Sequence, residues 1–115
     1  MTFLMKQHDL RPYITGQILA PHPTLANQTV PLDLTNATGT SIIVRKRGST
    51  VVKFKKTLTI TNATQGEWEY SWDLGDTDET GTFEFEIEIM WGTEPQTVPV
   101  AGYETFTIND DIDSP

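Results

Sequence analysis

Strict alternation of apolar and charged side chains in one stretch, Thr82 to Trp91, is the feature that most constrains the fold. Apolar residues occupy every second position, namely Phe83, Phe85, Ile87, Ile89 and Trp91. The positions between them hold Glu84, Glu86, Glu88 and Met90. Successive side chains of a β-strand point to opposite faces, whereas a helix would scatter these carboxylates around its circumference. The stretch is therefore predicted to be a strand with one buried face and one face in water.

The other segments also favour strands, and none of convincing length has helical periodicity. A second clear alternation, in Glu67–Trp72, places three aromatic residues on one face. Further strands are predicted over Thr2–Asp9, Tyr13–Ala20, Ser41–Arg47, Thr50–Lys55, Leu58–Thr61 and Gln96–Asn109. Pro99 and Gly102 predict a bulge or an edge in the last of these. The sequence thus predicts seven to eight short strands, which is typical of an antiparallel, immunoglobulin-like β-sandwich, with an open barrel as the nearest alternative.

A length of 115 residues fits a single domain with one core. Hydrophobic residues make up 37% of the chain, which is too apolar for a disordered protein despite the net charge of −8. We expect the sandwich domain to cover residues 1–109. The acidic segment Asp110–Pro115 is expected to be a flexible tail.

Charge and cysteine content narrow the range of functions. Sixteen Asp and Glu face eight Lys and Arg, which argues against binding to nucleic acid or to an anionic membrane. The chain has no cysteine, so disulfides, thiolate catalysis and zinc–thiolate sites are excluded. The apolar start, Met1–Met5, is too short for a signal-peptide core, and no segment approaches the length of a membrane span. We therefore expect neither a secretion signal nor a membrane anchor.

The charges are segregated along the chain. Six of the eight basic residues lie between Arg45 and Lys56, and ten of the sixteen acids lie between Glu67 and Glu94. The row of glutamates is expected to pair with the basic strands, either across one sheet or on a neighbouring subunit. The candidate interaction surface consists of Arg45, Arg47, Lys53, Lys55, Glu84, Glu86 and Glu88.

Three other patterns suggest chemistry but have simpler explanations. The acidic loop Asp73–Glu79 invites a calcium site, yet its spacing does not match an EF-hand, and a solvated turn with Asx caps explains it better. The glutamate row could serve a glycosidase only if two carboxylates faced each other across a cleft. His8 and His22 are too isolated for a metal site or a catalytic dyad. We expect no catalytic residues, metal, cofactor or small-molecule ligand.

The aromatic residues leave one further alternative open. A carbohydrate-binding module would use Trp68, Tyr70, Trp72 and Trp91 as a stacking platform. It requires at least two of the three tryptophans to be coplanar and exposed. Their position opposite the charged residues favours a place in the core instead.

Two stretches carry a family resemblance. The first is Val30–Thr38, which is followed by the apolar run Ile42–Arg45. The second is Gly66–Trp72, which is followed by the segment Gly75–Phe83. A turn at Gly92 comes next, then Pro99, and finally Gly102 and Tyr103 at the entry to the last strand. This order of motifs resembles the immunoglobulin-like N-terminal domain of tailed-phage baseplate upper proteins. The resemblance covers about Lys6 to Ile108.

The resemblance implies a virion structural protein without enzymatic activity. Relatives of that domain occur in phage tails, necks and heads, so a tail or baseplate position is expected first and a head or neck position second. The implied partners are other virion proteins, in several copies within a symmetric assembly that forms in the host cytoplasm. Asp78 and Gly81 loosely match a corner motif of immunoglobulin-like folds, but Phe83 replaces its usual tyrosine. The corner is therefore expected to depend on packing and on the conformation of Gly81 alone.

Overall fold

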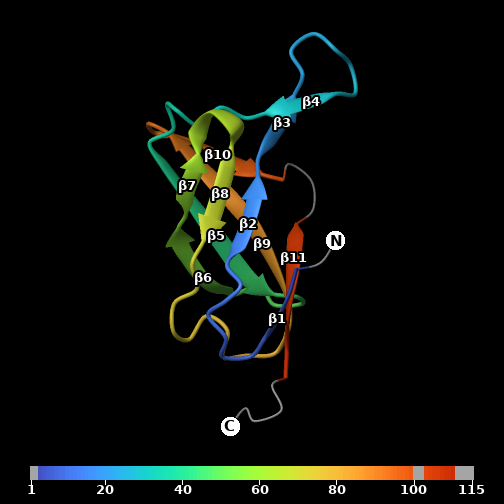
Figure 1. The fold of residues 1–115 in the computed structure, drawn as a ribbon, viewed down its shortest axis with the longest axis vertical. Coiled ribbons are helices and arrows are strands. Elements are labelled where there is room, and N and C mark those ends of the chain that lie inside the picture. The colour runs from blue at the N-terminus through green and yellow to red at the C-terminus, as the bar shows by residue number, and fades with distance from the viewer. Residues whose placement is uncertain (1–2, 100–102, 111–115) are drawn as a thin grey trace.

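The computed structural model describes residues 3–99 and 103–110, and these residues form an all-β fold (Figure 1). One short 3-10 helix, Ala63–Gln65, interrupts the strands. The strands are β1 (Phe3–Lys6), β2 (Ile14–Gln17), β3 (Leu19–Pro21), β4 (Thr29–Pro31), β5 (Gly39–Lys46), β6 (Val52–Thr57), β7 (Thr59–Asn62), β8 (Glu67–Tyr70), β9 (Gly81–Trp91), β10 (Glu94–Val98) and β11 (Glu104–Asn109). The prediction of an all-β domain is confirmed.

The strands form two principal sheets and one short hairpin. The larger sheet has the order β1-β11-β9-β5-β6, and β10 also pairs with β9. The smaller sheet has the order β2-β8-β7, while β3 and β4 form a hairpin that projects from one end of the molecule (Figure 1). The strand pairs are antiparallel except for β1 with β11, which is parallel. The predicted β-sandwich is confirmed, although the parallel pair was not expected.

The core lies between the inner faces of the two sheets. The alternating apolar residues of β9 are buried as predicted, with Phe83 and Ile89 fully inaccessible to solvent. Trp68 and Trp72 face them from the smaller sheet and its outgoing loop, and are 5% and 4% exposed. Burying side chains of this size contributes about 1.5–3 kcal/mol each. Trp91, at the end of β9, packs against the core but is only partly buried.

Two of the predicted strands are divided in the structure. Tyr13–Ala20 contains β2 and β3, which belong to different sheets. Gln96–Asn109 contains parts of β10 and β11, which both pair with the same edge of β9. β10 ends with Val98 opposite Ile87, and β11 begins with Glu104 opposite Phe85, so pairing with β9 is interrupted after Val98. The irregularity predicted at Pro99 is present.

Some predictions concern residues outside the described ranges. Gly102 is one of them, and so is most of the acidic tail that was expected at Asp110–Pro115. Of that tail only Asp110 is described, and its carbonyl oxygen accepts a hydrogen bond of 3.3 Å from Lys6 Nζ. One strand was missed altogether: β4 lies in a stretch that was expected to be a connection.

Gly16 lies at a position where the packing of the core requires a glycine. It lies in β2, directly opposite Trp68 in β8. A Cβ atom at Gly16 would lie only 2.5 Å from Cζ2 of the Trp68 indole and 2.7 Å from its Cε2. Any larger residue therefore has to displace a buried ring from a packed core.

We expect Gly16→Ala to destabilise the protein by about 1–3 kcal/mol, because the new methyl group overpacks the core. Gly39→Ala is the matched control: Gly39 also lies in a strand, but its nearest Cβ contact would be Met90 at 4.0 Å. Gly39→Ala should change stability by no more than about 0.5 kcal/mol. Urea unfolding followed by tryptophan fluorescence measures both changes. Equal stability of the two variants would show that the indole does not restrict this position.

Candidate interaction surface

The glutamate row lies on the outer face of the larger sheet. In the register of β5 with β9, Arg45 lies opposite Glu84, Ile43 opposite Glu86, and Ser41 opposite Glu88. Because β9 buries the alternate residues, these glutamates point away from the core. The row is therefore spaced along an open sheet face, and it does not form a pair of carboxylates facing each other across a cleft.

Ion pairs connect this row to the basic strands. Arg45 Nε lies 3.2 Å from Glu84 Oε1, and Arg47 Nε lies 3.9 Å from Glu84 Oε2. Lys55 Nζ of β6 lies 2.8 Å from Glu88 Oε1 of β9, so this contact spans the intervening strand β5. The predicted pairing across the sheet is confirmed. Each such exposed pair contributes about 0–1 kcal/mol, so the pairs influence register more than stability.

Two members of the candidate surface do not join these pairs. Lys53 turns toward the loop between β8 and β9, where its Nζ lies 3.1 Å from Asp78 Oδ1 and 3.8 Å from Glu79 Oε1. It occupies the irregularity where the register of β5 with β6 shifts. Among the described residues, no hydrogen bond or ion pair involves the carboxylate of Glu86. The seven residues thus divide into a paired outer face, a corner contact through Lys53, and one carboxylate without an internal cation.

Tyr103 also belongs to this face. The guanidinium carbon of Arg45 lies 4.4 Å from the centroid of the Tyr103 ring, which is a cation–π contact. Tyr103 is 45% exposed. The sequence placed it only at the entry to the last strand, and no pattern in the sequence pointed to its contact with Arg45.

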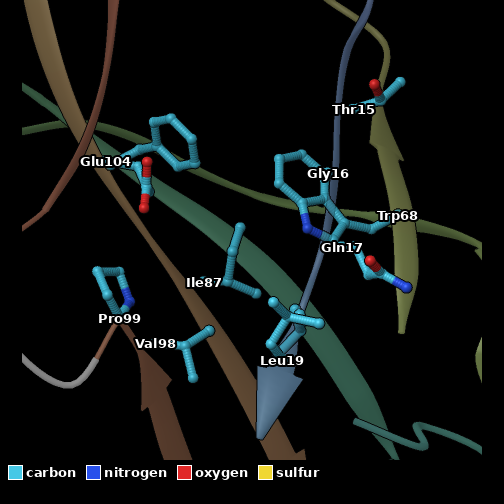
Figure 2. A pocket seen from close by; sticks show the side chains of 11 residues that line it. Thr15, Gly16, Gln17, Leu19, Trp68, Ile87, Val98, Pro99 and Glu104 are labelled. Atoms are coloured by element: carbon cyan, nitrogen blue, oxygen red, sulfur yellow. The ribbon is translucent and has the colours of Figure 1, made fainter. Parts of the chain in front are cut away.

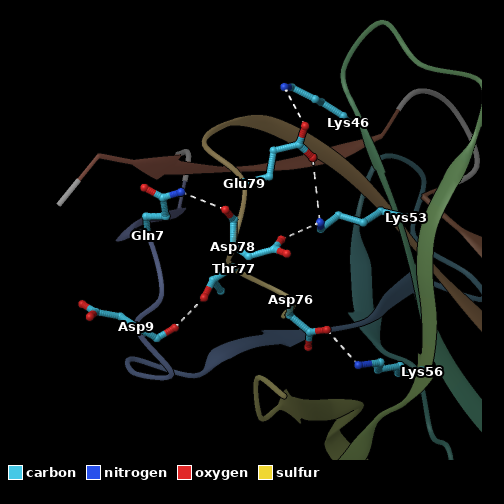
Figure 3. A network of polar contacts seen from close by, with 9 residues as sticks. All are labelled: Gln7, Asp9, Lys46, Lys53, Lys56, Asp76, Thr77, Asp78 and Glu79. Carbon is cyan, nitrogen blue, oxygen red and sulfur yellow. Dashed lines mark hydrogen bonds and ion pairs between the residues drawn. The ribbon is translucent and has the colours of Figure 1, made fainter. Parts of the chain in front are cut away.

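A buried carboxylate fastens the loop that joins β8 to β9. Asp76 is only 4% exposed. Its Oδ2 accepts hydrogen bonds from the hydroxyl of Tyr70 (2.5 Å) and from the backbone N–H of Asp73 (2.9 Å). Its Oδ1 accepts a bond of 2.8 Å from Lys56 Nζ (Figure 3). Because Tyr70 lies in the smaller sheet and Lys56 in the larger one, Asp76 joins both sheets.

This network corrects two expectations. The corner near Gly81 was expected to depend on packing and backbone conformation alone, but it contains the hydrogen bonds of Asp76. Gly81 does adopt a positive φ of 133°. The acidic loop was expected to be a solvated turn, yet Asp76 and Thr77 are buried. Sequence reasoning missed Asp76 because nothing local shows which side chains converge on it.

The same loop also holds the segment that follows β1. The hydroxyl of Thr77 donates to the carbonyl oxygen of Asp9 (2.9 Å), and the backbone N–H of His8 donates to the carbonyl oxygen of Thr77 (2.9 Å). Gln7 Nε2 donates to the carbonyl oxygen of Asp78 (2.8 Å) (Figure 3). The loop is therefore a structural junction, with polar contacts to the N-terminal segment and to both sheets.

Metal and sugar sites find little support in this geometry. In residues 3–99 and 103–110, no group of three or more histidine or carboxylate side chains is placed to hold a metal ion. Trp68 and Trp72 are buried, and Trp72 Nε1 donates a hydrogen bond of 2.9 Å to the carbonyl oxygen of Pro12. Two of the three tryptophans are thus inside the molecule, which contradicts the exposed coplanar platform that a carbohydrate-binding module would need.

A cleft of about 410 Å³ opens between the two sheets beside β2. Its wall is mainly apolar, with Trp68 and Gly16 on the side of the smaller sheet and Ile87 and Val98 on the side of the larger one (Figure 2). Glu104 is the only ionisable side chain among the residues that line it. The cleft is therefore suited to apolar side chains more than to polar chemistry.

Comparison with known proteins does not extend this account. No protein-family model matches the chain, and a search of curated proteins finds no match. In the described part of the chain, no helix has the length and apolarity needed to span a membrane.

The Asp76 network predicts a fall in stability at alkaline pH. Burial, together with the hydrogen bond to Asp76, raises the pKa of the Tyr70 hydroxyl well above its usual value. The bond to Asp76 also raises the pKa of Lys56. Above about pH 10 the unfolded chain releases both protons while the folded protein keeps them, so the free energy of unfolding should fall as pH rises. Each proton contributes a slope of up to about 1.4 kcal/mol per pH unit.

Tyr70→Phe isolates the contribution of the hydroxyl. We expect this variant to be about 1–3 kcal/mol less stable at pH 8, because Asp76 loses a hydrogen-bond donor in the core. Between about pH 10 and 11 its stability should fall less steeply than that of the wild type. Urea unfolding at a series of pH values measures both effects. Parallel pH profiles for the two proteins would contradict the assigned role of Tyr70.

Proposed function

We propose that the chain is a structural component of a tailed-phage virion, associated with the tail or baseplate, that acts by protein–protein contact in a symmetric assembly. The observation that carries this proposal is the order of motifs along the chain, from Val30–Thr38 through Gly75–Phe83 to Tyr103. That order resembles the immunoglobulin-like N-terminal domain of baseplate upper proteins.

The positions of these motifs in the fold support the proposal. The segment Gly75–Phe83 forms the corner that Asp76 ties to both sheets. The segment Val30–Thr38 leads from the β3–β4 hairpin into β5, and Leu34 within it is buried. The residues that carry the resemblance therefore have structural roles, which is consistent with a domain related by its whole fold.

The surface of the molecule also supports a role in docking. The outer face of the larger sheet presents alternating charges together with the exposed ring of Tyr103. Aromatic and arginine side chains are enriched at protein–protein interfaces. A head or neck protein that decorates or connects other subunits would use the same features, so this remains the second candidate.

Mass spectrometry of purified virions tests the proposal. Particles of the phage that encodes the chain are purified by density-gradient centrifugation, and peptides are quantified against the major capsid protein. We expect the chain to band with the particles at a constant copy number that fits the symmetry of a tail, neck or head. A non-structural protein of the same phage serves as the control and should be lost during purification. Loss of the chain to the same extent would overturn the proposal.

A further inference from the structure

Strand β2 has one edge without a partner strand. Among the described residues, β2 pairs only with β8. The backbone N–H of Ile18, just after β2, donates to the carbonyl oxygen of Gly66, just before β8. In an antiparallel ladder the backbone groups alternate in direction, so Ile14 and Gly16 face β8. The backbone N–H and C=O groups of Thr15 and Gln17 therefore point to the open edge.

The edge of β2 also lacks most of the features that usually prevent pairing with another chain. Such features are very short strands, lysines, prolines and bulges, and β2, with four residues, has only the first of them. In the described parts of the sheets, the other outer strands each have one: Lys6 in β1, three lysines in β6, a register shift in β7 and Pro95 in β10. Strand β2 contains only Ile14, Thr15, Gly16 and Gln17. Its edge is thus the least protected one in the sandwich.

The apolar cleft adjoins this edge. A strand added next to β2 would point alternate side chains inward, level with Gly16. Because Gly16 has no side chain, an inward-pointing side chain of the added strand would contact Trp68 on one side and Ile87 and Val98 on the other (Figure 2). The edge supplies backbone hydrogen bonds and the cleft supplies pockets, which are the two requirements for binding by strand addition.

The charges around the edge indicate which strand would fit. Glu67 and Glu69 lie on the outer face of the smaller sheet, opposite Gln17 and Thr15 respectively. Glu104 lines the cleft. In the described residues no ion pair involves any of these three carboxylates, and β2, β7 and β8 contain no lysine or arginine. These three carboxylates around the β2 edge thus lack an internal cation in the described residues, in contrast to most carboxylates of β9.

We propose that the open edge of β2 accepts an extended strand from another protein chain, with apolar side chains entering the cleft and basic side chains lying outside toward Glu67 and Glu69. The inference rests on the proposed function only in taking that chain to be another virion protein. A lysine on the added strand is long enough to reach Glu67 or Glu69 across β2, because Lys55 in the same way contacts Glu88 across one intervening strand. A basic residue on the added strand has to span β2 in the same way.

The charges also disfavour the simplest alternative partner. Two copies of this chain joined edge to edge through β2 would bring together two sets of Glu67, Glu69 and Glu104. Each copy carries a net charge of −8, and like charges across an interface weaken association. The charges therefore favour a basic strand of a different protein over the β2 edge of a second copy.

The test uses the full chain and a synthetic eight-residue peptide in which valine alternates with lysine. We expect the peptide to bind and to shift the amide NMR signals of Thr15 and Gln17 more than those of β6 or β7. A peptide with glutamate in place of lysine should bind at least tenfold more weakly. Glu67→Gln combined with Glu69→Gln should weaken binding of the lysine peptide by about threefold or more. Binding that leaves the β2 signals unchanged would overturn the proposal.

Thr15→Pro separates strand addition from simple charge attraction. Proline removes the N–H that points to the open edge, and such a position tolerates proline because its N–H has no partner strand. We expect this variant to stay folded by circular dichroism and to lose peptide binding by at least tenfold. Thr15→Val, which keeps the N–H and the shape of the side chain, should bind like the wild type. Equal binding by the proline and valine variants would contradict strand addition.

Two further results are informative. Sedimentation of the chain alone should show a monomer. A dimer that Thr15→Pro abolishes would mean that a second copy of the chain occupies the β2 edge. That result would overturn the proposal. Peptide binding is measured without virions, so its failure leaves the virion proposal standing. Conversely, loss of the chain from purified particles leaves the edge and its peptide binding unaffected.

Discussion

Strand β9 has to bury one face and hydrate the other, and the rest of the sandwich is arranged around that requirement. Its inner residues, from Phe83 to Ile89, are at most 6% exposed. β5 pairs along nearly all of one edge, and β10 and β11 together occupy the other. Both edges of β9 are thus occupied by neighbouring strands. Its glutamates point to the outer face of the sheet, where Arg45 and Lys55 supply cations. The most acidic strand of the chain thus has most of its charge compensated internally.

The second constraint is the polar junction at Asp76. A buried carboxylate is costly unless its hydrogen bonds are satisfied, and Asp76 receives donors from Tyr70, Lys56 and the backbone of Asp73. These donors come from both sheets and from the loop itself. The junction therefore fixes how the two sheets meet at one end of the sandwich. The corner motif of immunoglobulin domains instead uses a tyrosine hydroxyl bonded to the backbone.

Local alternation was sufficient to predict the faces of β8 and β9, the burial of Trp68 and Trp72, and the pairing of Glu84 and Glu88 with basic strands. These predictions succeed because side-chain direction in a strand follows sequence position. The Asp76 network could not be predicted, because Tyr70 and Lys56 lie in different sheets and meet Asp76 only through the packing of those sheets. The division of Tyr13–Ala20 into β2 and β3 was missed for the same reason. The parallel pairing of β1 with β11, which leaves β2 with an open edge, is also a property of topology alone.

Besides the charged outer face of the larger sheet, the smaller sheet and its β2 edge form a second surface that is available for function. There, within residues 3–99 and 103–110, the carboxylates have no internal cations, β2 carries no protective residue, and an apolar cleft lies alongside. Hydrogen exchange of individual backbone amides tests this central claim most directly. The account predicts that the amide of Gly16, bonded to β8, exchanges at least about a hundredfold more slowly than the amides of Thr15 and Gln17 on the open edge. Equal protection of all three amides would contradict it, because the edge would then already be occupied.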